Sequence, residues 1–404
     1  MIITVLLDTF PSISETFLYA TIANWQKAGM DVRLLARKRG QSPHQIPFQA
    51  EITWLPSEGL PAPFKFLVTL FFLARLLFSP RKLKTAFSIL RYAQGLRPKL
   101  QLAARFFPLC YYQTDLVYFP FGGLAVKYLE FMLETDSQVV FSLRGSDIHI
   151  DPLVQPYRER LQLALMAADG IHCVCDEIRL RAIDIVLGES LPNLSVIYTA
   201  LSPEFLTQDI PQKKLPSPDK SMQMVSVGRL DWRKGFEHGL VAARALMERG
   251  MDFHWRIIGE GEYRLALQWA IRDMGLREKV ILTGPMKHQD VLAILQSADV
   301  FFHPSIHEGI SNAVLEAMAL GLPVVASEVG GMREALPAES VGLLVPARDW
   351  RAMADALEKL ALDPKLRMDM GVSASNFVRS RFTVQEQTRG FLTLFRQVME
   401  SEGR

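Results

Sequence analysis

Short apolar runs alternate with amphipathic stretches of helical periodicity along most of this chain, and this alternation is what most constrains its fold. The pattern is typical of βαβ units, in which helices cover a buried parallel sheet. Because it occurs twice, it predicts an α/β protein with two Rossmann-like domains that face a central cleft and bind ligands at the carboxyl ends of the strands. The expected strands are 2–7, 32–36, 116–119, 139–143, 171–174 and 195–198 in the first half, and 223–227, 254–258, 280–282, 300–302, 323–326 and 343–345 in the second.

The length and one Pro-rich stretch predict where the domains divide. At roughly 100 to 200 residues per domain, 404 residues favour two domains. Residues 206–220 are polar and Pro-rich without usable periodicity, which indicates an interdomain linker. We therefore expect a first domain at 1–205, a second at 221–383 and a terminal helix within 384–404.

Composition excludes several classes of protein. The formal net charge of +2 is too balanced for a protein that binds nucleic acid over its whole surface. The three cysteines are too few for a disulfide scaffold or a four-cysteine zinc site. The first residues lack the basic region and cleavage site of a signal peptide, so we expect a cytoplasmic protein.

Residues 59–114 contain nine Lys or Arg and no Asp or Glu, interleaved with Phe and Leu. The longest apolar run, 64–78, is shorter than the roughly 20 residues that span a bilayer. A basic apolar surface of this kind favours binding to an anionic membrane surface, at the inner face of the plasma membrane. The alternative is a buried helical hairpin with a solvated basic rim.

The first motif that carries chemistry is Gly228-Arg229 with Lys234, where an expected strand turns into a helix. An Arg fork, a Lys ammonium and the unpaired N–H groups of a helix start suit a diphosphate. On spacing alone, surface salt bridges are an equally good interpretation of these two cations.

The second motif is the segment 302–323, which contains Glu308, Gly309 and Glu316. A buried strand delivers a loop that carries Glu308, Gly309 permits close approach of the backbone, and a following helix carries Glu316. Two carboxylates placed in this way can accept hydrogen bonds from hydroxyls on two different rings.

With these motifs, the second half resembles the retaining GT-B glycosyltransferases of family 4. The resemblance rests on motifs in the family's order: Gly228-Arg229-Leu with Lys234-Gly235, Ile258-Gly-Glu-Gly261, Leu282-Thr-Gly284, Pro304-Ser305, Glu308-Gly309 with Glu316-Ala-Met-Ala, Gly321-Leu-Pro-Val-Val, Gly330-Gly331 with Glu334, and Gly342-Leu-Leu-Val-Pro346. In the first half, Pro11-Ser-Ile-Ser-Glu-Thr-Phe17, with Ser12 and Ser14, resembles the first loop of the exopolysaccharide and lipopolysaccharide branch.

The resemblance implies a role for each matching residue. Arg229 and Lys234 would hold the donor diphosphate and stabilise its developing charge. Glu308 would bind the donor sugar, Glu316 would bind the ribose, and no dedicated nucleophile is demanded. The remaining residues implied to contact the donor are Gly228, Gly259, Gly261, Leu282, Thr283, Gly309, Ile310, Ser311 and Asn312. The terminal helix would cross back to the first domain.

One departure from the family concerns the first half. Where many relatives have a His-Gly-x-Asp turn, this chain has Arg144-Gly-Ser-Asp147, followed by His149. An Arg cannot shuttle protons near neutral pH. Arg144 is instead a candidate for binding an anionic group, and Asp147 and His149 are candidates for contacts to the acceptor.

Weaker patterns are set aside. Gly259-Glu-Gly261 is a partial dinucleotide fingerprint that lacks its third glycine. His303 and His307 flank Glu308, but Pro304 breaks the helix that a metal site of that spacing would need. We therefore expect no metal and no cofactor.

The resulting hypothesis is a retaining, metal-independent glycosyltransferase that moves a sugar from a nucleotide diphosphate sugar, UDP favoured over GDP. The acceptor would be a glycan or lipid-linked sugar in the synthesis of bacterial exopolysaccharide or cell-surface polysaccharide. One alternative is a sugar-nucleotide epimerase on the same scaffold. Another is a membrane-bound partner subunit that has lost catalysis, which Arg144 in place of His motivates.

Overall fold

A computed structural model describes residues 1–12, 16–40, 52–207 and 221–401. The chain divides into two compact units. Unit 1 comprises Met1–Ile197 and Gln387–Arg404, and unit 2 comprises Tyr198–Glu386. We expected the first domain to end at residue 205, but the boundary falls earlier, after Ile197. The reason is that residues after Ile197 pack with unit 2, where Phe205 is buried in the core. The expected linker begins inside the short helix α10 (Pro203–Thr207), and its residues 208–220 lie outside the described residues.

Unit 1 contains a seven-stranded sheet in the order β3-β2-β1-β4-β5-β6-β7, with every neighbouring pair parallel. The six strands expected in this half are present, and the short edge strand β3 is additional. The strands are β1 (Ile2–Phe10), β2 (Asp31–Arg39), β3 (Ile52–Trp54), β4 (Leu116–Phe119), β5 (Gln138–Leu143), β6 (Gly170–Cys173) and β7 (Leu194–Val196). The helices are α1 (Thr16–Lys27), α2 (Ala62–Leu76), α3 (Pro80–Ile89), α4 (Leu96–Tyr112), α5 (Gly122–Lys127), α6 (Leu129–Glu134), α7 (Ser146–His149), α8 (Gln155–Ala167) and α9 (Asp176–Ile185).

The terminal helix α18 (Val384–Glu400) packs against the sheet of unit 1. Phe391 and Phe395 are buried there, with ring centroids 4.9 and 5.2 Å from Trp25. The close packing needs a glycine on β6, since a Cβ at Gly170 would lie 2.6 Å from Val398. The last helix thus completes the core that the first strands begin.

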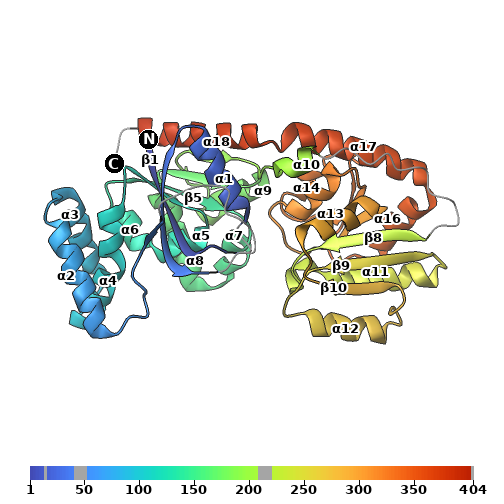
Figure 1. Ribbon diagram of the computed structural model, residues 1–404, viewed down its shortest axis with the longest axis horizontal. Helices are drawn as coiled ribbons and strands as arrows, with labels where there is room; N and C mark the ends of the chain where they lie inside the picture. Colours follow the sequence, from blue (N-terminus) through green and yellow to red (C-terminus); the bar gives the residue numbers. More distant parts are fainter. Residues whose placement is uncertain (13–15, 41–51, 208–220, 402–404) are drawn as a thin grey trace. The chain divides into compact units, whose positions relative to one another are not determined.

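Helices α2, α3 and α4 stand together at one end of unit 1 (Figure 1). Of the α2 side chains only Phe72 and Leu76 are buried, and Phe64, Leu67 and Phe71 are more than half exposed. The alternative of a buried hairpin is therefore wrong for α2. In the described part of the chain, no helix combines the length and apolar character needed to cross a membrane.

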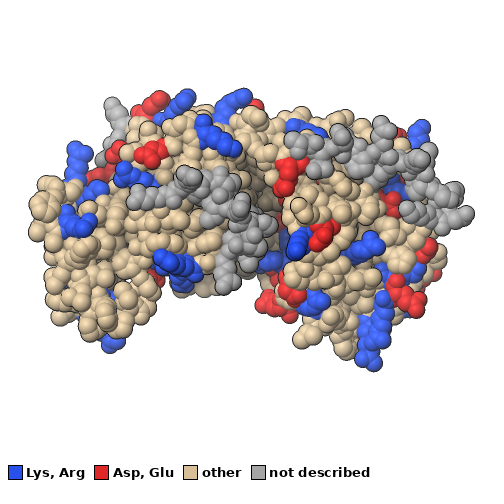
Figure 2. All heavy atoms as spheres, viewed as in Figure 1, with Lys and Arg blue, Asp and Glu red and all other residues tan. Residues whose placement is uncertain are grey.

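From the absence of Asp and Glu in 59–114 we expected its nine cations to be uncompensated, and the structure corrects this for two of them. Arg91 pairs with Glu134 at 2.5 Å and Arg105 with Glu58 at 3.3 Å, so acids outside the segment neutralise two of them. Lys82 donates to two backbone carbonyls, those of Tyr111 and Gln113. Figure 2 shows the remaining surface at this end of unit 1 as largely uncharged, with separate basic side chains.

Unit 2 contains a six-stranded parallel sheet in the order β10-β9-β8-β11-β12-β13, with all six expected strands present. Hydrophobic clusters pack on both of its faces. The strands are β8 (Met222–Val227), β9 (Phe253–Ile258), β10 (Val280–Gly284), β11 (Val300–His303), β12 (Val324–Ser327) and β13 (Leu343–Val345). The helices after α10 are the 3₁₀ turn η4 (Trp232–Lys234), α11 (Phe236–Glu248), α12 (Arg264–Asp273), α13 (His288–Ser297), α14 (Asn312–Ala319), α15 (Met332–Ala335), α16 (Trp350–Leu362) and α17 (Pro364–Arg381).

The strand order reverses between β8 and β11 in unit 2 and between β1 and β4 in unit 1. In open parallel sheets, ligands bind outside the carboxyl ends of strands at such a switch point. The loops that follow these four strands are therefore where each unit is expected to bind a ligand.

Candidate functional site

The loop after β8 is held in a fixed shape from Gly228 to Gly235. The Asp231 carboxylate accepts the backbone N–H of Arg233 and so caps η4. Gly235 then has a left-handed φ of 57°, and a Cβ there would lie 2.2 Å from the Pro304 carbonyl oxygen. Only glycine allows this close approach, which brings the Lys234 turn against the loop after β11.

Three side chains converge on one oxygen of Glu308. The Lys234 ammonium forms an ion pair with Oε1, and Ser305 Oγ donates to the same oxygen at 2.8 Å. His303 Nε2 lies 2.8 Å from it. The loops of β8 and β11 thus meet at the switch point through a single carboxylate.

The surroundings of Glu308 keep it ionised. Burial by itself raises the pKa of this carboxyl, but Lys234 and His303 outweigh burial and hold the pKa well below its usual range. Burial lowers the pKa of His303, although Glu308 opposes the shift, so the imidazole is neutral near pH 7. A carboxylate only accepts hydrogen bonds, so the neutral ring donates its Nε2–H to Glu308.

Glycines let the neighbouring loops touch backbone to backbone. A Cβ at Gly259 would lie 1.8 Å from the Gly228 carbonyl oxygen, and one at Gly261 would lie 2.3 Å from that of Leu230. The backbone N–H of Gly331 donates to the Gly309 carbonyl at 2.7 Å. Loops from four strands are therefore locked together around Lys234 and Glu308.

Arg229 extends from the same turn and is available to a ligand. Its side chain is 65% exposed, and its Nε lies 3.7 Å from Asp231 Oδ2. Arg233 binds that carboxylate more closely, at 2.5 Å. Because Arg233 occupies Asp231, Arg229 keeps most of its hydrogen-bonding capacity for another partner.

Glu316 lies on α14 and differs from Glu308 in its surroundings. Its half-buried carboxyl has no hydrogen-bond or ion-pair partner among the described residues. Burial, with a smaller contribution from Glu204, raises the pKa of Glu316 to about 8. An unpartnered carboxyl of this kind is suited to accept hydrogen bonds from the hydroxyls of a ligand.

The other donor residues predicted in unit 2 lie around these groups. Ser311 is the N-cap residue of α14, and Asn312 Oδ1 accepts from Thr199 Oγ1 at 3.2 Å. Ile310 packs on the core, so its backbone rather than its side chain is offered at the start of the helix. Leu282 and Thr283 are half-buried at the end of β10, where Thr283 Oγ1 donates to the Gly284 carbonyl at 3.1 Å.

In unit 1 the turn after β5 holds Arg144 in place. Its guanidinium carbon lies 4.5 Å from the centre of the Phe17 ring and 5.8 Å from that of Phe121, and Nε donates to the Pro120 carbonyl at 3.0 Å. Two aromatic rings and a backbone acceptor thus position a cation beside the switch point.

Asp147 is used by the turn itself. Oδ1 accepts from the backbone N–H groups of Arg144 and Gly145 at 3.0 and 2.8 Å, and Oδ2 accepts from that of Gly122 at 2.9 Å. Its residue is only 6% exposed. Asp147 thus fixes the turn through backbone amides, and its contact to the acceptor stays a prediction.

His149 pairs with Glu177 through Nε2 at 2.8 Å, so it too has a protein partner. The backbone N–H of Ser12 donates to the Tyr19 hydroxyl, and that hydroxyl donates to the Ser12 carbonyl. Ser14 lies outside the described residues. Among the described residues, no group of three or more His, Cys, Asp or Glu side chains could hold a metal ion.

Sequence reasoning missed His303 and Ser305 as partners of Glu308. Both were within the strand-to-helix segment that the sequence singles out, but His303 was considered only as a metal ligand. A His at the carboxyl end of a buried strand, five residues before a candidate carboxylate, is the signal that could have found this contact.

Part of the chain matches a known protein family. Residues 207–377 match the family "Glycosyl transferases group 1". The chain is 36% identical over 151 residues to the putative colanic acid biosynthesis glycosyltransferase WcaL of Escherichia coli, covering 36% of this chain and 37% of that protein. It is 29% identical over 252 residues to the amylovoran biosynthesis glycosyltransferase AmsK of Erwinia amylovora, covering 61% of this chain and 60% of that protein. The matched segment thus spans between about a third and three fifths of these relatives.

Solved structures resemble the whole chain at low sequence identity. Sucrose-phosphate synthase from Thermosynechococcus elongatus has a TM-score of 0.71 at 18% identity and covers 100% of both chains. Anabaena HepE in complex with UDP has a TM-score of 0.70 at 15% identity, covering 98% of this chain and 99% of that one. The two parallel sheets with their switch points have the GT-B architecture, and the segment 207–377 is similar to the glycosyl transferases group 1 family.

Proposed function

We propose that this protein is a retaining glycosyltransferase that moves a sugar from a nucleotide diphosphate sugar to a glycan or lipid-linked acceptor. The pathway would be the synthesis of bacterial exopolysaccharide or cell-surface polysaccharide. The observation that carries the proposal is the Lys234–Glu308–His303 cluster at the switch point of unit 2. The names of WcaL and AmsK, which are polysaccharide glycosyltransferases, support the pathway.

The donor diphosphate would bind at the turn after β8. Arg229 offers an exposed planar fork, and Lys234 offers a point charge at the same loop. Both cations would stabilise the negative charge that develops on the diphosphate as it leaves. These two residues supply the charge neutralisation in the proposal, which therefore includes no metal ion. HepE in complex with UDP supports UDP over GDP as the nucleotide.

Glu308 would position the donor sugar. Its carboxylate is ionised and fixed on one oxygen by three contacts, so it can accept sugar hydroxyls with a defined geometry. Because the Glu308 carboxylate is held so firmly, it would orient the donor sugar and would not attack it. Retention would then come from substitution on the same face of the sugar, without a protein nucleophile.

The acceptor would bind to unit 1. Arg144, clamped between Phe17 and Phe121, would contact an anionic or hydroxyl group of the acceptor. The exposed apolar side chains of α2, with Arg81, Lys84, Arg97 and Lys99 nearby in the sequence, would rest on the inner face of the plasma membrane. This location would bring the enzyme to a lipid-linked acceptor.

The test is a transfer assay with UDP-sugars and GDP-sugars, with and without a bacterial glycolipid extract. We expect nucleotide release and sugar transfer only when a UDP-sugar and the extract are both present, unchanged by a chelator. Proton NMR of the product would show whether the anomeric configuration is retained. Consumption of the donor without the extract would favour the epimerase, and nucleotide binding without turnover would favour the degenerate subunit.

A further inference from the structure

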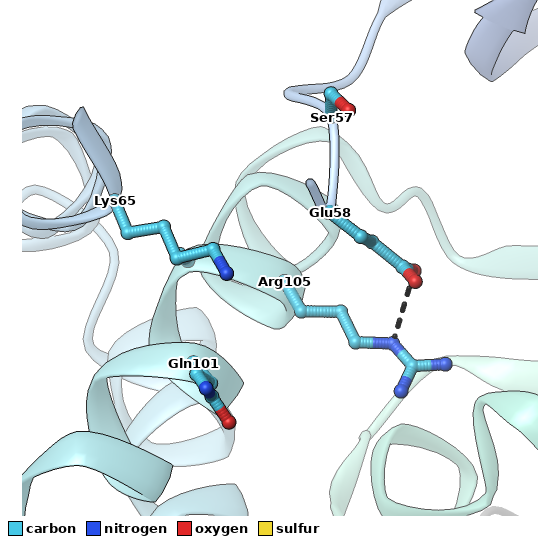
Figure 3. Close-up of a pocket in the computed structure, with 6 residues that line it drawn as sticks. Ser57, Glu58, Lys65, Gln101 and Arg105 are labelled. Carbon is cyan, nitrogen blue, oxygen red and sulfur yellow. Dashed lines mark ion pairs between the residues drawn. The ribbon is translucent and has the colours of Figure 1, made fainter. Parts of the chain in front are cut away.

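Unit 1 contains a pocket that the donor site does not use. It encloses about 300 Å³ between the loop after β3 and helices α2 and α4 (Figure 3). Its lining residues are Ser57, Glu58, Lys65, Gln101, Ala104 and Arg105. Both helices belong to the acid-free segment 59–114, so the pocket is lined in part by the helices that we propose face the membrane.

The charges around the pocket are unbalanced. Glu58 Oε1 lies 3.4 Å from Arg37 Nε, 3.3 Å from Arg105 Nε and 3.3 Å from Lys127 Nζ. Asp8 also pairs with Lys127, at 2.7 Å. With Lys65 on the wall, four cations meet two carboxylates. An excess of positive charge in a partly enclosed space attracts an anion.

Donors on the pocket wall have few protein partners. Arg105 Nε is buried and makes no hydrogen bond, although it forms an ion pair with Glu58 Oε1 at 3.3 Å, and Arg105 Nη2 donates to the Lys127 carbonyl at 2.8 Å. Among the described residues, no hydrogen bond or ion pair engages the Lys65 ammonium or the Gln101 amide. Figure 3 shows Lys65 extending from α2 toward the helix that carries Arg105, and the Arg105 side chain extending toward Glu58. Unpartnered donors of this kind are suited to phosphate oxygens.

The position of the pocket fits a substrate. Asp8 and Arg37 lie near the carboxyl ends of β1 and β2, and Glu58 follows β3. The pocket therefore lies at the edge of the sheet where parallel α/β units bind ligands. Next to Lys65 on α2, Phe64, Leu67 and Phe71 recur at helical spacing and are 56%, 59% and 52% exposed. An anion pocket thus adjoins an exposed apolar strip.

We propose that this pocket binds the phosphate or diphosphate of a lipid-linked acceptor, with the hydrocarbon chain lying along Phe64, Leu67 and Phe71 of α2. The inference rests on the proposed function, because it names the chemistry of the acceptor. Glu58 holds the cations together when the pocket is empty of ligand and gives way to the phosphate when the acceptor binds. Arg105, Lys65 and Gln101 then supply the donors.

The experiment measures binding of farnesyl phosphate to the full chain saturated with UDP, so that the donor site is blocked. Farnesol and inorganic phosphate serve as comparison ligands. We expect farnesyl phosphate to bind at least about ten-fold more tightly than either, because both halves of the site contribute. Lys65→Glu should weaken farnesyl phosphate binding about ten-fold or more, and Glu58→Gln should strengthen it several-fold.

Lys99→Glu is the matched control, since it makes the same charge change on α4 outside the pocket lining. It should leave farnesyl phosphate binding unchanged. Equal losses in Lys65→Glu and Lys99→Glu would overturn the pocket in favour of general attraction to anionic lipid. Equal binding of farnesol would overturn the phosphate site, and equal binding of inorganic phosphate would overturn the apolar half. If Glu58→Gln lowers the melting temperature without tightening binding, the cluster is structural only and the inference fails.

The two proposals fail separately. Efficient transfer to an acceptor without phosphate, with no binding of farnesyl phosphate, would leave the glycosyltransferase standing and remove this inference. Should UDP not bind, the same titration in the Arg229→Ala variant tests the pocket without a functional donor site. If Lys65→Glu does not weaken farnesyl phosphate binding in that background, the pocket is overturned whatever the enzyme's activity.

Discussion

Each unit has an acidic residue near the point where the strand order of its sheet reverses. The two carboxylates differ in the groups that hold them. In unit 1, Asp147 accepts hydrogen bonds from backbone amides of its own turn and of Gly122. In unit 2, Glu308 is held by three side chains from two different loops. The first arrangement fixes a loop, and the second fixes a charge that we propose faces a ligand.

The difference shows that topology alone does not make a site. Both sheets bring loop residues together at the reversal of strand order. What separates the units is the local chemistry: unit 2 adds a Lys, a neutral His and an exposed Arg, whereas unit 1 adds a cation between two aromatic rings. Each prediction below tests one half of this contrast.

The largest effect that we expect is the loss of turnover in Glu308→Gln. The amide keeps the shape of the side chain but removes the charge that Lys234 and His303 face. We expect turnover to fall by about 10² to 10³-fold, the size found when a fixed electrostatic contact to the transition state is removed. Nucleotide affinity should change little, because Arg229 and Lys234 remain. Initial rates of transfer and calorimetric titration with UDP measure the two quantities.

The control for this variant is Glu339→Gln, at a side chain that is 83% exposed in the same unit. It should behave like the wild type in both measurements. Wild-type turnover in Glu308→Gln would show that the charge cluster only stabilises the loop, and unit 2 would then resemble unit 1.

Arg229→Ala should weaken UDP binding by about ten- to a hundred-fold. The side chain is exposed and has spare donors, so its loss removes contacts to the diphosphate without disturbing the fold. The UDP-induced rise in melting temperature measures the effect. Arg277→Ala, at an exposed Arg of unit 2, is the matched control. An unchanged rise in Arg229→Ala would place the diphosphate elsewhere.

Much of the fold could be predicted, because buried strands of a parallel sheet are nearly continuous apolar runs. The short edge strand β3 was missed because it has three residues, of which none is fully buried, and no pattern of its own. Within the site, the loop positions of Lys234 and Glu308 follow from the strand-to-helix spacing.

What could not be predicted depends on contacts between distant segments. The backbone partners of Asp147 come from residues near it and from Gly122, so a pattern of residue types cannot distinguish a capping carboxylate from a ligand-binding one. The opposite pKa directions of Glu308 and Glu316 depend on which cations the folded chain brings near each carboxyl. The pocket beside Arg105 likewise requires the packing of α2 on α4.

Asp147→Asn should lower stability by about 1 to 3 kcal/mol, because its amide group cannot accept the backbone N–H groups that the lost oxygen served. Urea unfolding followed by circular dichroism measures the change, and Asp136→Asn, at an exposed carboxyl of unit 1, is the control. UDP affinity should stay at the wild-type value. A large loss of turnover with unchanged stability would give Asp147 a role in transfer like the one that we propose for Glu308.

The smallest expected effect concerns Glu316, whose pKa is raised to about 8 by burial and by Glu204. A raised pKa means that the folded protein binds the proton more tightly than the unfolded chain does. The stability that this proton contributes is present below the unfolded pKa of about 4.3 and is lost as the pH rises through about 8. Glu316→Gln, which has no charge to bury, should therefore gain melting temperature relative to the wild type between pH 6 and 9.

The affinity for nucleotide should also depend on the ionisation of Glu316. Ribose hydroxyls that donate to Glu316 favour its ionised form, so UDP affinity of the wild type should rise between pH 7 and 9. Glu316→Gln should bind UDP more weakly and without this rise. Because Glu308 is already ionised throughout this range, the Glu308→Gln variant should retain the pH dependence. A rise that disappears in Glu308→Gln and persists in Glu316→Gln would reverse the roles assigned to the two carboxylates of unit 2.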